Sequence, residues 1–140
     1  METDWIGFWN QVTPDANAII IPGDGSTYSY AHINDAAGRL ISFLQSTYGI
    51  RKSDRICILS ENRVEYIYLF ASAQKSGFIL CPLNYRLTAH EIDGLIKDAQ
   101  PKLVLYETQF AHLIPKGPDI KSMNIETLSD QLPDQPFAER

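Results

Sequence analysis

The sequence is poor in cysteine, has no basic excess and contains no long apolar run. Its two cysteines, Cys57 and Cys81, lie inside short apolar runs and show no spacing typical of a disulfide framework or a zinc site. We therefore interpret them as buried free thiols. A general nucleic-acid-binding protein would carry a basic balance, and the net charge of −5 argues against that class.

Signals for export and for membrane insertion are also missing. The N-terminus, METDWIGFWNQ, carries acids where a signal peptide needs a basic segment. No apolar run approaches the roughly 20 residues that span a bilayer, so we expect no transmembrane segment and a cytoplasmic location. The chain has 140 residues, of which 44% are hydrophobic and 21% are charged, a size and composition typical of one globular domain.

Motifs for phosphate binding and for nucleophilic catalysis are absent. The sequence contains no G-x-G-x-x-G, no Walker A motif and no G-x-S-x-G. The three histidines, His32, His90 and His112, lie apart on expected helices, where surface or capping roles are usual. No pair of carboxylates is placed for general acid–base work. We therefore predict no catalytic residue and no metal site in this chain.

Helices and strands alternate along the chain. An amphipathic helix is predicted over residues 3–12, because apolar residues recur there at helical spacing: Trp5, Ile6, Trp9 and Val12. A hairpin follows, with strands at 18–21 and 26–28 and its turn at Asp24-Gly25.

A longer amphipathic helix is predicted between Ser29, a typical N-cap, and Gly49, a typical C-terminal residue. Its expected inward face consists of Ile33, Ala36, Ala37, Leu40, Leu44 and Tyr48. A polar link then leads to the first strand of a sheet.

Three apolar runs, at residues 55–59, 78–83 and 103–106, predict strands that are buried on both faces. The helix after the first strand is expected to begin at Asn62, with Glu65 completing a capping box. Because Leu69 and Phe70 make this helix apolar almost all round, we expect it to be deeply buried.

Thr88 and Glu91 form the capping box of the helix between the second and third strands. Its expected inward residues are Ile92, Leu95, Ile96 and Ala99. A further helical turn is predicted over residues 108–114, a short strand over 123–125 and a linker over 133–140.

This order predicts an α/β fold, with a parallel βαβαβ sheet, helices on both faces and a small N-terminal hairpin. Ligands bind such sheets beyond the carboxyl ends of the strands, where residues 60–63 and 84–86 lie.

Arg86 stands out, because its loop follows a strand and precedes a helix N-terminus, and both favour an anion. The alternative is that Arg86 only tethers its loop. One charge-assisted contact to phosphate contributes roughly 1.5–3 kcal/mol, so Arg86 alone is not a nucleotide site.

Four motifs stand in order along the chain: STYSY at 26–30, GIRKSDRI at 49–56, SENRVE at 60–65 and SGFILCPLNYRL at 76–87. Together they resemble the motifs of the adenylate-forming superfamily, which includes acyl-CoA synthetases, aryl-CoA ligases and the adenylation domains of peptide synthetases. The family patterns are T-Y-x-E-L, G-L/I/V-x-K-G-D-R-V, S-x-N-x-x-E and x-G-A-x-x-x-P-L-N-x-R-L. The N-x-R-L ending is most similar to the acyl- and aryl-CoA synthetase branch. Two departures are Ser53, where the family usually has Gly, and a missing Glu at the first motif.

The resemblance implies a larger parent enzyme that uses ATP, Mg²⁺ and CoA to convert a small-molecule carboxylate to its acyl-adenylate and then its thioester. It implies that Arg86 contacts a CoA phosphate, while Tyr85 and Asn84 shape the loop. The family's phosphate loop, adenine and ribose motifs and catalytic lysine domain have no counterpart in this sequence.

We therefore expect residues 1–132 to be the N-terminal subdomain of such a synthetase, inactive alone, with 133–140 as a linker toward the missing phosphate-loop region. Its expected partners are the remaining domains of the parent, and an exposed apolar face is expected to favour a dimer. The alternative is a free-standing α/β protein-interaction module derived from the same family.

Overall fold

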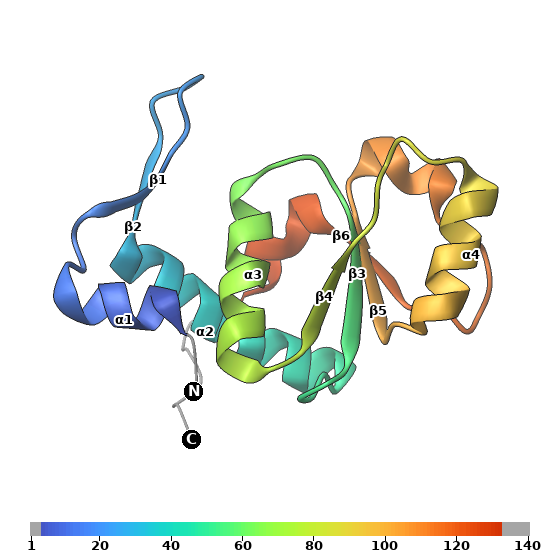
Figure 1. The fold of residues 1–140 in the computed structure, drawn as a ribbon, viewed down its shortest axis with the longest axis horizontal. Helices are drawn as coiled ribbons and strands as arrows, with labels where there is room; N and C mark the ends of the chain where they lie inside the picture. The colour runs from blue at the N-terminus through green and yellow to red at the C-terminus, as the bar shows by residue number, and fades with distance from the viewer. Residues whose placement is uncertain (1–3, 133–140) are drawn as a thin grey trace.

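A four-stranded parallel sheet forms the centre of the computed structural model, which describes residues 4–132 (Figure 1). Its strands are β3 (Arg55–Leu59), β4 (Ile79–Pro82), β5 (Leu103–Tyr106) and β6 (Ser122–Asn124). They lie in the order β4-β3-β5-β6, and every neighbouring pair is parallel. The predicted βαβαβ sheet is confirmed, and the short strand expected near residue 123 is its fourth member.

Helices cover both faces of this sheet, as predicted (Figure 1). On one face lie α2 (Tyr30–Tyr48), α3 (Val64–Ser76) and the 3₁₀ helix η2 (Ile125–Gln131); on the other lie α4 (Ala89–Ala99) and the 3₁₀ helix η1 (Thr108–Leu113). The central strand β3 serves both layers, because successive side chains point to opposite faces. Ile56 and Ile58 enter the core beneath α2 and α3, whereas Cys57 and Leu59 enter the core beneath α4.

Helix α2 begins and ends as its sequence predicts. The Ser29 hydroxyl accepts a hydrogen bond from the His32 N–H at 3.1 Å, and Gly49 adopts a left-handed φ of +64°. The predicted inward face is buried from Ile33 to Leu44, and Tyr48 at its end is half-buried. The capping box of Thr88 and α4 is likewise confirmed.

The N-terminal segment contains α1 (Trp5–Val12) and a hairpin of β1 (Asn17–Ile20) and β2 (Thr27–Ser29) that projects away from the sheet (Figure 1). Both elements were predicted. The expected inward stripe of α1 was wrong, however. Trp5 and Trp9 are 62% and 43% exposed, and of the predicted stripe only Ile6 packs against the core, because α1 lies beside α2 and α3 rather than over the sheet.

Two predictions for α3 were wrong. The helix begins at Val64 after Arg63, which makes no side-chain cap, so neither Asn62 nor Glu65 has the expected capping role. The Glu65 carboxylate instead accepts hydrogen bonds from the Arg63 guanidinium. The helix is also not buried all round, because Phe70 is 45% exposed.

The second strand was predicted to be buried on both faces, and this was also wrong. β4 lies at the edge of the four-stranded sheet, so Ile79 is 44% exposed and Cys81 is only half-buried. Leu95 of α4, which was expected to point inward, is 42% exposed. The remaining members of the predicted α4 face are buried or half-buried.

Within residues 4–132, no helix combines the length and the apolar character needed to cross a membrane. The linker predicted for residues 133–140 lies outside the described residues.

Candidate functional site

The loops that follow β3 and β4 leave the sheet at its carboxyl edge, where a ligand site is expected (Figure 1). The loop after β4 carries the predicted residues Asn84, Tyr85 and Arg86. It forms a tight turn, in which the Leu87 N–H donates to the Asn84 carbonyl at 3.1 Å. The Asn84 side chain closes the same turn, because its Oδ1 accepts a hydrogen bond from the Arg86 N–H at 3.0 Å.

Tyr85 anchors this turn to the body of the domain. Its ring stacks on Phe110 of η1, with ring centroids 4.7 Å apart and an angle of 19° between the planes. Phe110 is buried in the core beneath α4, and Tyr85 packs against that core. The tyrosine ring therefore supports the loop rather than facing outward as a ligand contact.

Arg86 lies at the exposed tip of the turn. Within residues 4–132 its guanidinium makes no ion pair or hydrogen bond, so the loop is held by Asn84 and Tyr85 and not by the arginine. This arrangement fits an arginine that is available for an external anion better than an arginine that tethers its own loop.

The N-terminus of α4 contributes less to an anion site than the sequence suggested. The Glu91 carboxylate already accepts hydrogen bonds from the Thr88 N–H at 2.8 Å and from the Thr88 hydroxyl at 3.0 Å. Hydrogen bonding from the Thr88 backbone is the main reason why the pKa of Glu91 is lowered. Because one carboxylate occupies this helix end, attraction for an incoming phosphate falls mainly on Arg86.

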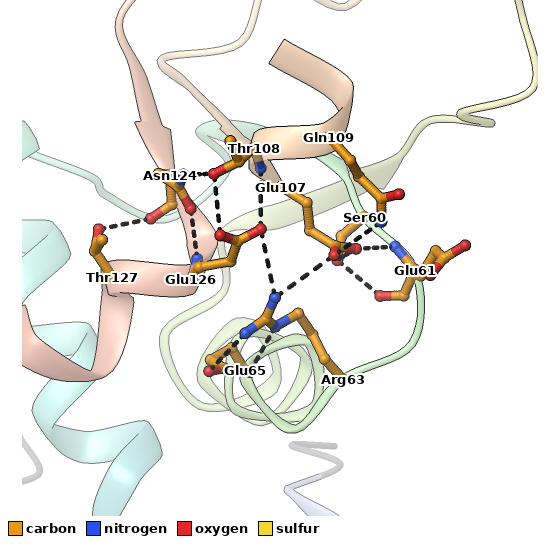
Figure 2. Close-up of polar contacts among 10 residues, drawn as sticks. All are labelled: Ser60, Glu61, Arg63, Glu65, Glu107, Thr108, Gln109, Asn124, Glu126 and Thr127. Carbon is orange, nitrogen blue, oxygen red and sulfur yellow. Dashed lines mark hydrogen bonds and ion pairs between the residues drawn. The ribbon is translucent and has the colours of Figure 1, made fainter.

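A second polar group lies at the carboxyl edge, and sequence reasoning missed it. We call it the Arg63 cluster: Arg63, Glu65, Glu107 and Glu126 (Figure 2). The Arg63 guanidinium donates to Glu65 at 2.8 and 3.3 Å, and its Nη1 lies 3.6 Å from Glu107 and 3.9 Å from Glu126. Three carboxylates surround one guanidinium, so this cluster is not suited to bind an anion.

Glu107 joins the β3–α3 loop to the end of β5 (Figure 2). Its Oε1 accepts hydrogen bonds from the Ser60 hydroxyl at 2.8 Å and from the Glu61 N–H, and its Oε2 accepts one from Gln109. Burial by itself would raise the pKa of Glu107. The hydrogen bonds from these three residues and the charge of Arg63 outweigh burial, so the pKa is lowered and the carboxylate stays ionised.

Glu126 fastens η2 and β6 to the start of η1. Its carboxylate accepts hydrogen bonds from the N–H and the hydroxyl of Thr108, both at 3.0 Å, while the Glu126 N–H donates to Asn124 at 2.7 Å (Figure 2). The Arg63 cluster therefore links three strand ends at one edge of the sheet. Glu107 could have been found from sequence, because it directly follows an apolar strand just as Ser60 does.

No side chains in the described range are grouped as a metal site requires: residues 4–132 contain no cluster of three His, Cys, Asp or Glu side chains that could hold an ion. His32 is exposed and shares a hydrogen bond with the Tyr68 hydroxyl at 2.6 Å, and the other two histidines are exposed. The edge of the sheet thus offers one exposed arginine on a supported turn, beside a structural cluster of charges.

Comparison with known proteins agrees with this fold. The sequence model of the family described as AMP-binding enzyme matches residues 8–139. Long-chain-fatty-acid–CoA ligase FadD13 of Mycobacterium tuberculosis is 35% identical over 103 residues, which make up 74% of this chain and 20% of that protein. The fatty acid–acyl-carrier-protein ligase ScoC of Streptomyces coeruleorubidus is 27% identical over 123 residues, covering 88% of this chain and 23% of that protein.

A solved structure shows the same architecture. The N-terminal domain of FACL13 from Mycobacterium tuberculosis superimposes with a TM-score of 0.88 at 27% identity, covering 100% of this chain and 38% of that one. The chain spans about a fifth of the length of the curated relatives that it matches. By its sequence match, its parallel sheet and its N-terminal hairpin, the chain belongs to the AMP-binding enzyme family.

Proposed function

We propose that this chain is the N-terminal subdomain of an AMP-forming acyl- or aryl-CoA synthetase. The parent enzyme would join a carboxylate to AMP from ATP, with Mg²⁺, and then transfer the acyl group to CoA. The observation that carries this proposal is the family match over residues 8–139, together with the supported N-x-R-L turn at the carboxyl edge of the sheet. The subdomain boundary at residue 132 and a cytoplasmic location stay predictions.

Within the parent, Arg86 is proposed to contact a phosphate at the nucleotide end of CoA. Its guanidinium is exposed and unpaired within residues 4–132, and both Asn84 and Tyr85 hold the turn without it. One charge-assisted hydrogen bond to phosphate contributes roughly 1.5–3 kcal/mol. That energy corresponds to about a 10- to 150-fold change in affinity for CoA.

The test of this role uses the full-length parent and measures its two half-reactions separately. For Arg86→Ala, we expect the KM for CoA in thioester formation to rise about 10- to 150-fold, as the energy above implies. Carboxylate-dependent exchange of pyrophosphate into ATP should be unchanged, because that step precedes CoA. Arg51→Ala is the matched control, since Arg51 is an exposed arginine that precedes the amino end of β3, whereas Arg86 follows the carboxyl end of β4. An unchanged KM for CoA in Arg86→Ala would refute the contact.

The chain alone is expected to have no adenylation activity. Attack of a carboxylate on the α-phosphorus requires positioned groups that neutralise charge. Those groups belong to family segments with no counterpart in this sequence. Pyrophosphate release that depends on added carboxylate, measured with the purified 140-residue chain, would contradict this expectation.

The size of the native protein decides between a synthetase and a free-standing interaction module. An antibody raised against this chain should detect a band several times larger than 15.8 kDa in extracts of the source cells. A band at 15.8 kDa would instead favour the module.

The dimer expected through an exposed apolar face stays a prediction. The exposed apolar side chains of α1 are Trp5, Phe8, Trp9 and Val12. Light scattering of the purified chain, with Trp5→Ser as the variant, measures it.

A further inference from the structure

Cys57 and Cys81 occupy directly opposite positions on neighbouring parallel strands. The register of β3 and β4 pairs these two residues, and both are free thiols. Both side chains belong to the core beneath α4, so they point to the same face of the sheet. Partners in adjacent strands are separated by about 4.8 Å. That separation falls within the roughly 4.4–6.8 Å between Cα atoms that a disulfide spans.

The two thiols differ in their access to solvent. Cys57 has no exposed surface, whereas Cys81 lies on the edge strand and is half-buried. Burial, and then the neighbouring Cys81 thiol, raises the pKa of Cys57 to about 12. A thiolate is therefore disfavoured in this apolar core, but a disulfide carries no charge and no hydrogen-bond donor and suits the same surroundings.

We propose that Cys57 and Cys81 form a reversible cross-strand disulfide when the protein meets a hydroperoxide. With hydrogen peroxide as the oxidant, the Cys81 sulfur reacts first and attacks one of the two peroxide oxygens. The O–O bond breaks, a sulfenic acid forms on Cys81, and the other oxygen leaves as water. The Cys57 sulfur then attacks the Cys81 sulfur, so that the S–S bond forms, the S–O bond breaks and a second water leaves. Two thiols lose two electrons and two protons, and one peroxide becomes two waters.

The bond would act directly on the strand that carries the candidate site. Cys81 lies three residues before Asn84, and β4 has a sheet neighbour only in β3 among the described strands. Joining the two strands would prevent β4, the edge strand, from separating from β3. The proposal concerns this chain alone and does not depend on the activity of a parent enzyme.

The second step has a characteristic pH dependence, because the attacking species is the Cys57 thiolate. The titratable groups that act on Cys57 are Cys81, which raises its pKa, and Arg55, which lowers it. Below that pKa, the thiolate fraction rises about tenfold with each pH unit. We therefore expect disulfide formation from the sulfenic acid to accelerate markedly between pH 7 and about pH 9.

The test treats the reduced, folded 140-residue chain with hydrogen peroxide, blocks free thiols with N-ethylmaleimide, and digests it with trypsin. Cleavage after lysine and arginine releases Cys57 in residues 56–63 and Cys81 in residues 76–86. We expect these two peptides to be joined, lighter by two hydrogen atoms than their sum, within monomeric chains. Dithiothreitol should separate them again.

The matched variants are Cys57→Ser and Cys57→Ala, the second being smaller and apolar in case serine disturbs the core. In either, Cys81 should be oxidised to sulfinic acid, because no resolving thiol lies beside it. The proposal is overturned if the unmodified chain also accumulates Cys81 sulfinic acid while Cys57 reacts with maleimide only after unfolding. It is equally overturned if the joined peptides occur only in covalent dimers.

Discussion

Removing the guanidinium of the Arg63 cluster should destabilise the domain substantially. Arg63→Ala deletes two charge-assisted hydrogen bonds to Glu65 and the longer-range attraction to Glu107 and Glu126. Breaking a buried ion pair by removing one partner costs about 3–5 kcal/mol. The Arg63 side chain is 27% exposed, so water can partly replace its contacts in the variant. We therefore expect the free energy of unfolding to fall by about 2–3 kcal/mol.

Urea denaturation followed by far-ultraviolet circular dichroism measures this loss. Tryptophan fluorescence is a poor alternative, because Trp5 and Trp9 both lie exposed on α1 and report little of the sheet. At roughly 4 °C per kcal/mol, the melting temperature should fall by about 8–12 °C. Arg63→Lys keeps the charge but not the planar fork, so its loss should be intermediate. Arg51→Ala should change stability by less than about 0.5 kcal/mol.

Acidification provides a second arm of the same experiment. In Arg63→Ala, Glu107 loses the nearby positive charge that helps to lower its pKa, so its carboxylate in the folded variant should take up a proton at a higher pH than in the unmodified protein. The deficit relative to the unmodified protein should therefore shrink as the pH falls from 7 to about 4. A deficit below about 0.5 kcal/mol at pH 7, or one that is constant over this pH range, would refute the view that Arg63 neutralises these acids.

Further predictions concern single side chains. The folded-state pKa of Glu107 lies below its ordinary value of 4.5, so its ionised form stabilises the fold above that pH and the benefit is lost as the pH falls through the lowered pKa. Glu107→Gln should thus cost about 1–3 kcal/mol at pH 7 in urea denaturation, with a smaller cost near pH 3; a cost that grows on acidification would contradict this sign. Gly49→Ala should lower stability by about 1 kcal/mol, because Gly49 has a φ of +64°. Gly94→Ala should raise stability by up to about 1 kcal/mol, because alanine favours a helix and a methyl group added at Gly94 would have no other atom within 4 Å. The two variants should therefore shift the melting temperature in opposite directions.

Features that depend on nearby residues could be predicted from the sequence. The Ser29 cap, the left-handed Gly49 and the capping box of Thr88 each need only residues within one helical turn. The strands followed from apolar runs, and their parallel arrangement followed from the helices between them. The turn from Asn84 to Leu87 was placed correctly because it lies between two such elements.

Features that depend on strand order could not be predicted in the same way. An apolar run such as Phe78 to Leu83 is the same string of letters at the centre or at the edge of a sheet, and only the order β4-β3-β5-β6 makes Ile79 exposed. The contact of Ser60 with Glu107 spans 47 residues of sequence. Glu65 was predicted to complete a capping box because it lies three residues after Asn62, but its carboxylate accepts hydrogen bonds from the Arg63 guanidinium instead.

The central position of β3 has a consequence for synthesis on the ribosome. Leu103, the first residue of β5, follows Leu59, the last residue of β3, by 44 positions. At roughly 5–20 residues per second, the ribosome needs about 2–9 s to translate from β3 to β5, and the side of β3 that pairs with β5 stays unpaired for that time. During that interval the run Ile56-Cys57-Ile58-Leu59 presents an apolar, unpaired edge, which is the kind of segment that other nascent chains can join. Chaperone demand during translation is therefore expected to be greatest between the emergence of β3 and that of β5.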